Sequence, residues 1–126
     1  MIMRTFGFFA LTVALVCATP LQAQPVSWGM AQCSALMDVM EDHVSGQPQK
    51  GYLAHAAEAM FVAAETQSRV DGRNPDELTR VHADKHDDWV AMGYTMAFKA
   101  EFRDWIDFCR SLARSYDVPL DASMLH

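Results

Sequence analysis

The apolar residues of this chain recur at the spacing of an α-helix, and no stretch alternates between apolar and polar positions as a β-strand would. The first regular segment predicts a helix over 27–44, with Ser27 as its N-cap. At 100° per residue its dry face collects Cys33, Leu36, Met37, Met40 and Val44. Its polar face collects Ser34, Asp38, Glu41 and Asp42. The breaker-rich stretch 45–48 ends this helix.

A second helix is predicted over 50–70. Its inner face collects Leu53, Ala56, Ala57, Met60, Ala63 and Ala64. Alanine side chains leave room for a neighbouring backbone, so the face predicts close approach by another helix. His55 and Glu58 fall on the outer side, and we assign them no role.

The clearest local signal starts the third helix. Asn74 supplies a capping side chain, Pro75 suits the first helical position, and Glu77 follows at the third. We therefore predict a helix that begins at Pro75.

The later part of the chain contains two apolar stripes that do not align. The earlier one joins Leu78, His82, Trp89 and Met96. The later one joins Phe98, Phe102, Ile106, Cys109, Ala113 and Tyr116, and it is turned by roughly 160° at ideal phase.

Either the chain breaks over 85–88, or the segment 89–98 is enclosed on all sides. We favour the break, with Asp87 or Asp88 capping a long final helix that ends before Val118. The polar side of that helix carries Arg103, Asp104, Asp107, Arg110, Ser111 and Arg114. The tail 119–126 is expected to fray.

Residues 1–23 have the three parts of a secretory signal peptide. Arg4 is their only charge, 6–18 is apolar, and Ala23 offers a small residue at the cleavage point. A retained anchor is the alternative, but the apolar run is shorter than the roughly 20 residues that a membrane-spanning helix needs. We expect cleavage, no stable membrane insertion afterwards, a periplasmic or secreted protein, and one helical domain over 24–126.

Export determines how the cysteines are interpreted. Cys17 belongs to the leader, so Cys33 and Cys109 remain, each at the centre of a dry stripe. Oxidising compartments favour disulfides, and two cysteines permit one internal pairing. The sequence therefore predicts an all-α fold: a small bundle of about four helices, with the first and last helices joined by a Cys33–Cys109 disulfide. The chain-entropy model gives such a bridge about 4 kcal/mol.

The charge balance bears on possible partners. The full chain has a net charge of −6, and removing the leader with its one arginine makes it −7. Nucleic acids and anionic membranes repel such a surface. A basic partner is compatible with it, although the same charge would also serve solubility. No nucleophile elbow, phosphate-binding glycine loop or Cys-X-X-Cys motif is present, so we do not expect an enzyme or a cofactor.

His82 and His86 are the candidate metal ligands. They lie four residues apart, so both rings could reach one ion from a helix, and Asp84, Asp87 and Asp88 supply nearby oxygens. Zinc is one possible ion. Methionine pairs such as Met37 with Met40 and Met92 with Met96 would suit copper(I), but they also suit a core. The competing interpretation of the histidines is ordinary polar residues close to a helix end.

Three aromatic residues are candidates for an interface. Trp105 and Phe108 lie toward one edge of the last dry stripe, and Trp28 starts the first helix. Aromatic residues at an edge are typical of partner interfaces, but they also pack the rims of small cores.

One short segment allows a comparison. Gly51-Tyr52-Leu53-Ala54 resembles a segment of the small exported helical immunity proteins that neutralise secreted amidase toxins. Those proteins carry a cysteine just before the Gly-Tyr pair, where this chain has Lys50. The two-cysteine helical format is also similar in architecture to the acid-stress chaperones of the periplasm. We transfer no residue role from either resemblance.

The leading hypothesis is a non-enzymatic module that binds a protein partner, as an inhibitor, immunity protein or stress chaperone. The alternative is a zinc- or copper-binding protein that uses His82 and His86 with acidic or methionine ligands. A third hypothesis is pH sensing by histidines.

Overall fold

The computed structural model describes residues 24–120, and the predicted signal peptide and residues 121–126 of the predicted frayed tail lie outside them. The described part is helical and contains no strand. Four α-helices and one short 3₁₀ helix follow in order: α2 (Val26–His43), α3 (Gln49–Val70), α4 (Glu77–Met92), η1 (Gly93–Phe98) and α5 (Ala100–Ser115). The predicted all-α bundle is confirmed.

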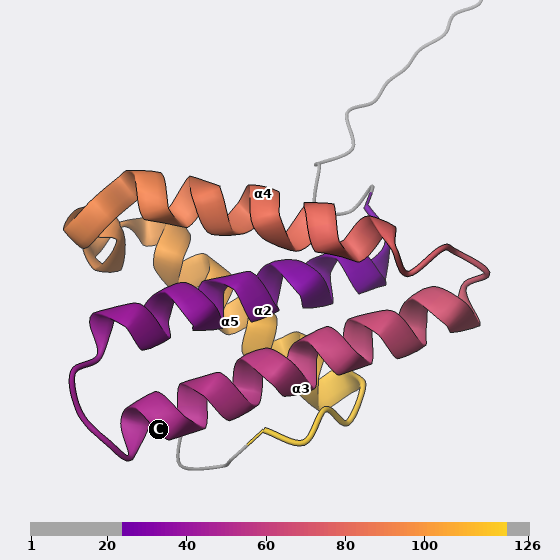
Figure 1. Ribbon diagram of the computed structural model, residues 1–126, viewed down its shortest axis with the longest axis horizontal. Coiled ribbons are helices and arrows are strands. Elements are labelled where there is room, and N and C mark those ends of the chain that lie inside the picture. Colours follow the sequence, from indigo (N-terminus) through magenta and orange to yellow (C-terminus); the bar gives the residue numbers. More distant parts are fainter. Residues whose placement is uncertain (1–23, 121–126) are drawn as a thin grey trace, which may run out of the picture.

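Helix α2 is the centre of the bundle. It packs against α3, α4 and α5. Figure 1 shows α2 lying between α3 and α4, with α5 crossing behind them. Because α2 has neighbours on three sides, its buried residues are not confined to one face: Ser27, Gly29, Met30, Ala31, Cys33, Ser34, Ala35, Leu36, Met37 and Val39.

The start of α2 corrects one prediction. Pro25 precedes the helix in an extended conformation, and its carbonyl accepts hydrogen bonds from the Trp28 and Gly29 amides. Ser27 is therefore not the N-cap but the second residue of α2, and it is fully buried. The Ser27 hydroxyl has no hydrogen-bond partner among the described residues. Neighbouring helices cover the first turn of α2, and the small Ser27 side chain is therefore buried among them.

The alanine face of α3 predicted close approach by a neighbouring helix, and that neighbour is α2. Ala56, Ala57 and Ala64 are buried in the core. The Ser34 hydroxyl of α2 donates a hydrogen bond to the Ala57 carbonyl of α3 over 2.6 Å. The sequence pattern predicts Ser34 on the polar face of its helix, but the residue is buried. The bond to Ala57 supplies the partner that a buried hydroxyl needs.

The break between the last two helices comes later than predicted. Helix α4 runs through 85–88 to Met92, so Asp87 and Asp88 are exposed helical residues and cap nothing. Gly93 then adopts φ 63° and ψ −150°, a region that is essentially restricted to glycine. The following 3₁₀ turn leads to Lys99, whose extended backbone precedes α5.

This shift changes the environment of the residues around the break. Trp89 is fully buried, and Met96 of η1 is 3% exposed, so the earlier stripe continues into the core. Phe98, assigned to the later stripe, is 84% exposed because it ends η1 before α5 begins. Tyr116 is also exposed rather than inward-facing. The remainder of the α5 stripe is centred on buried Cys109.

The predicted disulfide is confirmed. Cys33 and Cys109 are bonded, with their Cα atoms 5.7 Å apart. Both residues are buried, so the bridge joins α2 to α5 inside the core.

Helices α3 and α5 end in the same way, in a Schellman motif whose C′ residue has a left-handed backbone. Gly72 (φ 72°) occupies this position after α3, and Asp117 (φ 53°) occupies it after α5. The diagnostic six-to-one bonds run from Arg73 N to Ser68 O (2.8 Å) and from Val118 N to Ala113 O (2.9 Å).

These two helix ends predict substitutions of opposite sign. Gly72→Ala should lower the free energy of unfolding by about 1 kcal/mol, because a Cβ disfavours this backbone although nothing lies within 4 Å of it. Asp117→Gly should raise the free energy of unfolding by about 0.5 kcal/mol by removing the same strain. Urea unfolding of both variants checks the pair, and shifts in the same direction would contradict it.

Candidate functional site

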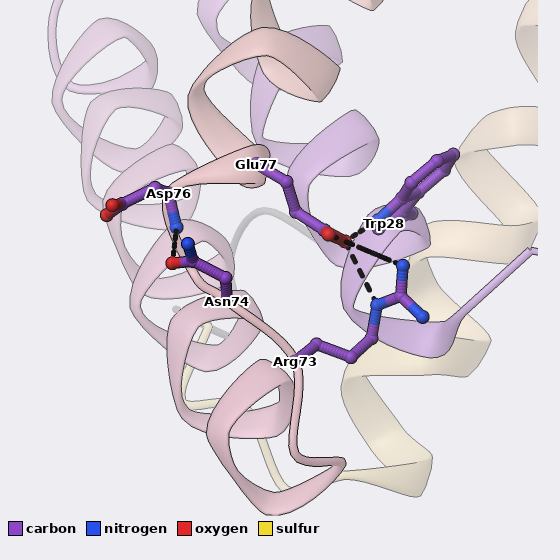
Figure 2. Close-up of polar contacts among 5 residues, drawn as sticks. All are labelled: Trp28, Arg73, Asn74, Asp76 and Glu77. Atoms are coloured by element: carbon purple, nitrogen blue, oxygen red, sulfur yellow. Dashed lines mark hydrogen bonds and ion pairs between the residues drawn. The ribbon is translucent and has the colours of Figure 1, made fainter.

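Trp28, a candidate interface residue, joins the start of α2 to the start of α4 (Figure 2). Its Nε1 donates a hydrogen bond to Glu77 Oε1. Arg73 forms an ion pair with the same carboxylate at 2.9 Å and lies 5.7 Å from the centre of the Trp28 ring. The Asn74 side chain accepts a hydrogen bond from the Asp76 amide, but the N-cap position of α4 is Asp76 and not Asn74 as predicted. The two residues after Asn74 form a turn, so α4 itself begins at Glu77 and not at Pro75.

This contact network predicts a response to acid. The hydrogen bond from Trp28, helped by Arg73, holds the pKa of Glu77 below its ordinary value of 4.5. A lowered pKa stabilises the folded state above the ordinary value, and that stabilisation is lost as the pH falls through the folded-state pKa. Between about pH 5 and pH 3, wild-type stability should therefore fall more steeply than that of Glu77→Gln. Thermal melts across this range measure it. The control is Glu101→Gln, which removes a carboxylate from the first turn of α5. The stability of this variant should fall with pH as steeply as that of the wild type.

Trp105 and Phe108 pack helices together. Trp105 is 8% exposed, and its ring centre is 5.2 Å from the ring centre of Phe108. Lys85 Nζ lies 4.3 Å from the centre of the Trp105 ring. The same ammonium group lies 5.4 Å from the Trp89 ring, so Lys85 links α4 to α5. Phe108 is half-buried beside Gly29, where a Cβ would meet its Cζ atom at 3.1 Å. Trp105 therefore exposes little of the apolar area that an interface would need.

The two histidines lie together on α4. The ring centres of His82 and His86 are 6.2 Å apart, and the rings are nearly parallel. His82 Nε2 is 2.8 Å from Asp38 Oδ2 on α2, while His86 Nδ1 is 4.0 Å from Asp87 Oδ1. Within residues 24–120, no group of three or more His, Cys, Asp or Glu side chains is arranged to hold a metal ion. Metal binding by His82 and His86 stays a prediction, which calorimetry with zinc and copper(I) can test.

A cleft lies between α3 and α4, with α2 as its floor. Its volume is about 380 Å³. The lining residues are Ser34, Asp38, Ala54, Ala57, Glu58, Phe61, Thr79 and His82. Four of them follow the helical spacing on one face of α3, from Ala54 to Phe61. We refer to this feature as the α3–α4 cleft.

The titratable groups of the α3–α4 cleft are a carboxylate–imidazole pair and one further carboxylate, and the Ser34 and Thr79 hydroxyls also line it. The Asp38 and His82 side chains are 38% and 24% exposed. The Phe61 and His82 rings are nearly perpendicular, with their centres 5.6 Å apart. Glu58 has no hydrogen bond or ion pair to any residue that the structure describes.

A second groove runs along the other side of α3. It measures about 450 Å³ and lies between α3 and the segment that follows α5. His55 Nε2 donates a hydrogen bond to the Pro119 carbonyl over 3.1 Å across this groove. The lining residues are Met30, His55, Glu58, Ala59, Val62, Ala63, Thr66, Gln67, Tyr116, Asp117, Val118 and Pro119. We refer to it as the C-terminal groove, and Glu58 borders both hollows.

His82 is predictable from the sequence as a candidate site residue, but the residues that surround it are not. Asp38 was placed on a polar helix face, Glu58 was given no role, and Phe61 was not considered. The available signal was that Ser34 and Asp38 are polar, lie four apart, and interrupt a helix that is otherwise rich in apolar residues.

The fold and its hollows define a small, disulfide-linked helical bundle with two grooves beside one helix. Comparison with known proteins adds no relationship, since no family model, no curated protein and no solved structure matches the chain. Among the described residues, none of the helices combines the length and the apolar character that crossing a membrane would require.

Proposed function

We propose that this protein is an exported, non-enzymatic module that binds a protein partner along α3. The observation that carries the proposal is the position of α3 between two hollows. The α3–α4 cleft lies on one side and the C-terminal groove on the other, and Glu58 borders both. Each hollow alone falls within the range of a single small-molecule pocket, about 300–1,000 Å³, but the two lie beside the same helix and both are open at the surface.

Exposed apolar area at α3 supports the same proposal. Val62 is 53% exposed, and it lines the C-terminal groove. Interfaces combine such apolar contacts with polar groups at their edges, and here His55 and Glu58 supply the polar groups. The buried disulfide supports export to an oxidising compartment, periplasmic or extracellular.

Site-specific photo-crosslinking in the exporting cell tests this proposal. A photoreactive amino acid at Val62 or at Glu58 should give a covalent adduct of one defined mass with the same partner. The matched control is Arg103, an exposed residue on the outer side of α5, which should give none. Val62→Asp should reduce the adduct at position 58 without changing the helical circular dichroism signal. Adducts at Arg103 alone, or none at any position, would contradict binding through α3.

A further inference from the structure

The α3–α4 cleft combines acidic groups, one of which contacts His82, with an apolar wall. Two carboxylates line it, from Asp38 and Glu58, and no lysine or arginine is among its lining residues. Its remaining surface includes the Phe61 ring and two alanine side chains. The cleft therefore differs from a solvated patch of acidic residues, because its charges border a hollow with an aromatic wall.

The hydrogen bonds already made in the cleft indicate which groups are available to a ligand. The Ser34 hydroxyl donates to the Ala57 carbonyl, so this donor is already used. Asp38 uses Oδ2 to contact His82, and its Oδ1 has no hydrogen bond to any residue within 24–120. Glu58 likewise makes no polar contact there. The available carboxylate oxygens are thus acceptors that carry negative charge, and the Thr79 hydroxyl lies beside them in the lining.

A guanidinium group matches this combination. It is planar, always charged, donates to carboxylates through a rigid fork, and stacks on aromatic rings. A lysine ammonium group would satisfy the charge but would gain less from the flat wall. A volume of about 380 Å³ holds one long side chain with part of its backbone.

We propose that the α3–α4 cleft receives an arginine side chain of the protein partner, with Asp38 and Glu58 accepting its hydrogen bonds and Phe61 lying beside its plane. This inference rests on the proposed function, and it names the chemistry by which the partner is recognised. The acidic balance of the chain, with a net charge of −6, favours the approach of such a basic segment.

Nuclear magnetic resonance titration of the oxidised protein provides the test. The probe is N-acetyl-arginine amide, and the control ligands are the neutral citrulline analogue and the lysine analogue. Saturable shifts are expected at Ala54, Phe61 and Thr79 with the arginine probe. Weaker shifts are expected with lysine, and none with citrulline. Equal binding of the lysine probe, or no saturation at tens of millimolar arginine, would overturn the proposal.

Variants separate recognition in the cleft from general attraction to an acidic protein. Glu58→Gln should weaken arginine binding about tenfold, the cost of one charge-assisted hydrogen bond, and Glu58 makes no contact that folding needs. Asp38→Asn should weaken it similarly. Asp107→Asn removes the same charge on the exposed side of α5 and should leave binding unchanged. Equal losses in all three variants would overturn recognition in the cleft.

The outcome can be distinguished from failure of the proposed function. If photo-crosslinks still form at Val62 in the Glu58→Gln and Asp38→Asn variants, the partner binds along α3 but does not place an arginine in the cleft. If no crosslinks form in the wild type, the proposed function itself fails, whatever the arginine titration shows.

Discussion

Replacing both Cys33 and Cys109 with alanine should lower the free energy of unfolding by about 4 kcal/mol. The bridge spans 76 residues of sequence, so its loss restores much conformational freedom to the unfolded chain. Small domains have a net stability of only about 5–15 kcal/mol, and the loss would therefore leave the fold marginal. Urea unfolding of the oxidised wild type and of the double variant measures the difference.

The reduced wild type is the control for this experiment. It keeps both sulfur atoms in the core, where Cys33 and Cys109 are buried, but lacks the covalent bond. Its stability should be closer to that of the double variant than to that of the oxidised protein. A difference below about 1 kcal/mol between the oxidised and reduced proteins would contradict the role given to the bridge.

Trp89→Ala should cost about 4 kcal/mol of unfolding free energy, comparable to the loss of the disulfide. Trp89 is fully buried, and its ring meets Phe102 of α5 edge-on at 6.1 Å between ring centres. The substitution leaves a cavity where α4 meets α5 and also removes one of the two rings beside Lys85. Thermal or urea unfolding monitored by circular dichroism gives the value.

The neighbouring residue gives a matched control. Val90 is 52% exposed on the same helix, and Val90→Ala should change stability by no more than about 0.5 kcal/mol. Trp89→Phe should cost less than Trp89→Ala, because it keeps an aromatic ring and removes an indole N–H that has no partner among the described residues. Equal effects at positions 89 and 90 would show that α4 does not pack through Trp89.

Features encoded by local spacing were predictable from the sequence. The expected helix over 27–44 is shifted by one residue from α2 (Val26–His43). The expected helix over 50–70 begins one residue after α3 (Gln49–Val70) and ends at the same residue. The disulfide followed from two cysteines at the centres of two dry stripes. Helical periodicity and the chemistry of thiols in an oxidising compartment depend on the chain alone, so they required no knowledge of the packing.

Features that depend on several helices together were not predictable. The break was placed before Trp89 because two stripes were compared as if they belonged to one straight helix. The backbone instead turns at Gly93, whose positive φ permits the end of α4. Similarly, Ser34 has the same local pattern whether its helix is at the edge or in the centre, and only the position of α3 determines that it is buried.

The candidate site depends on packing in the same way. Asp38 and His82 are 44 residues apart in sequence and meet only because α2 and α4 are neighbours. Glu58 and Phe61 complete the cleft from a third helix. Spacing within one helix could indicate the polar pair of Ser34 and Asp38, but not the hollow that three helices form around it.

The bond between Cys33 and Cys109 has a topological consequence for cleavage of the backbone. It closes a covalent ring that contains α3, α4 and η1. A single cut in the backbone anywhere inside this ring produces a nicked molecule whose two pieces remain tethered, so neither piece can diffuse away until a reductant opens the bridge.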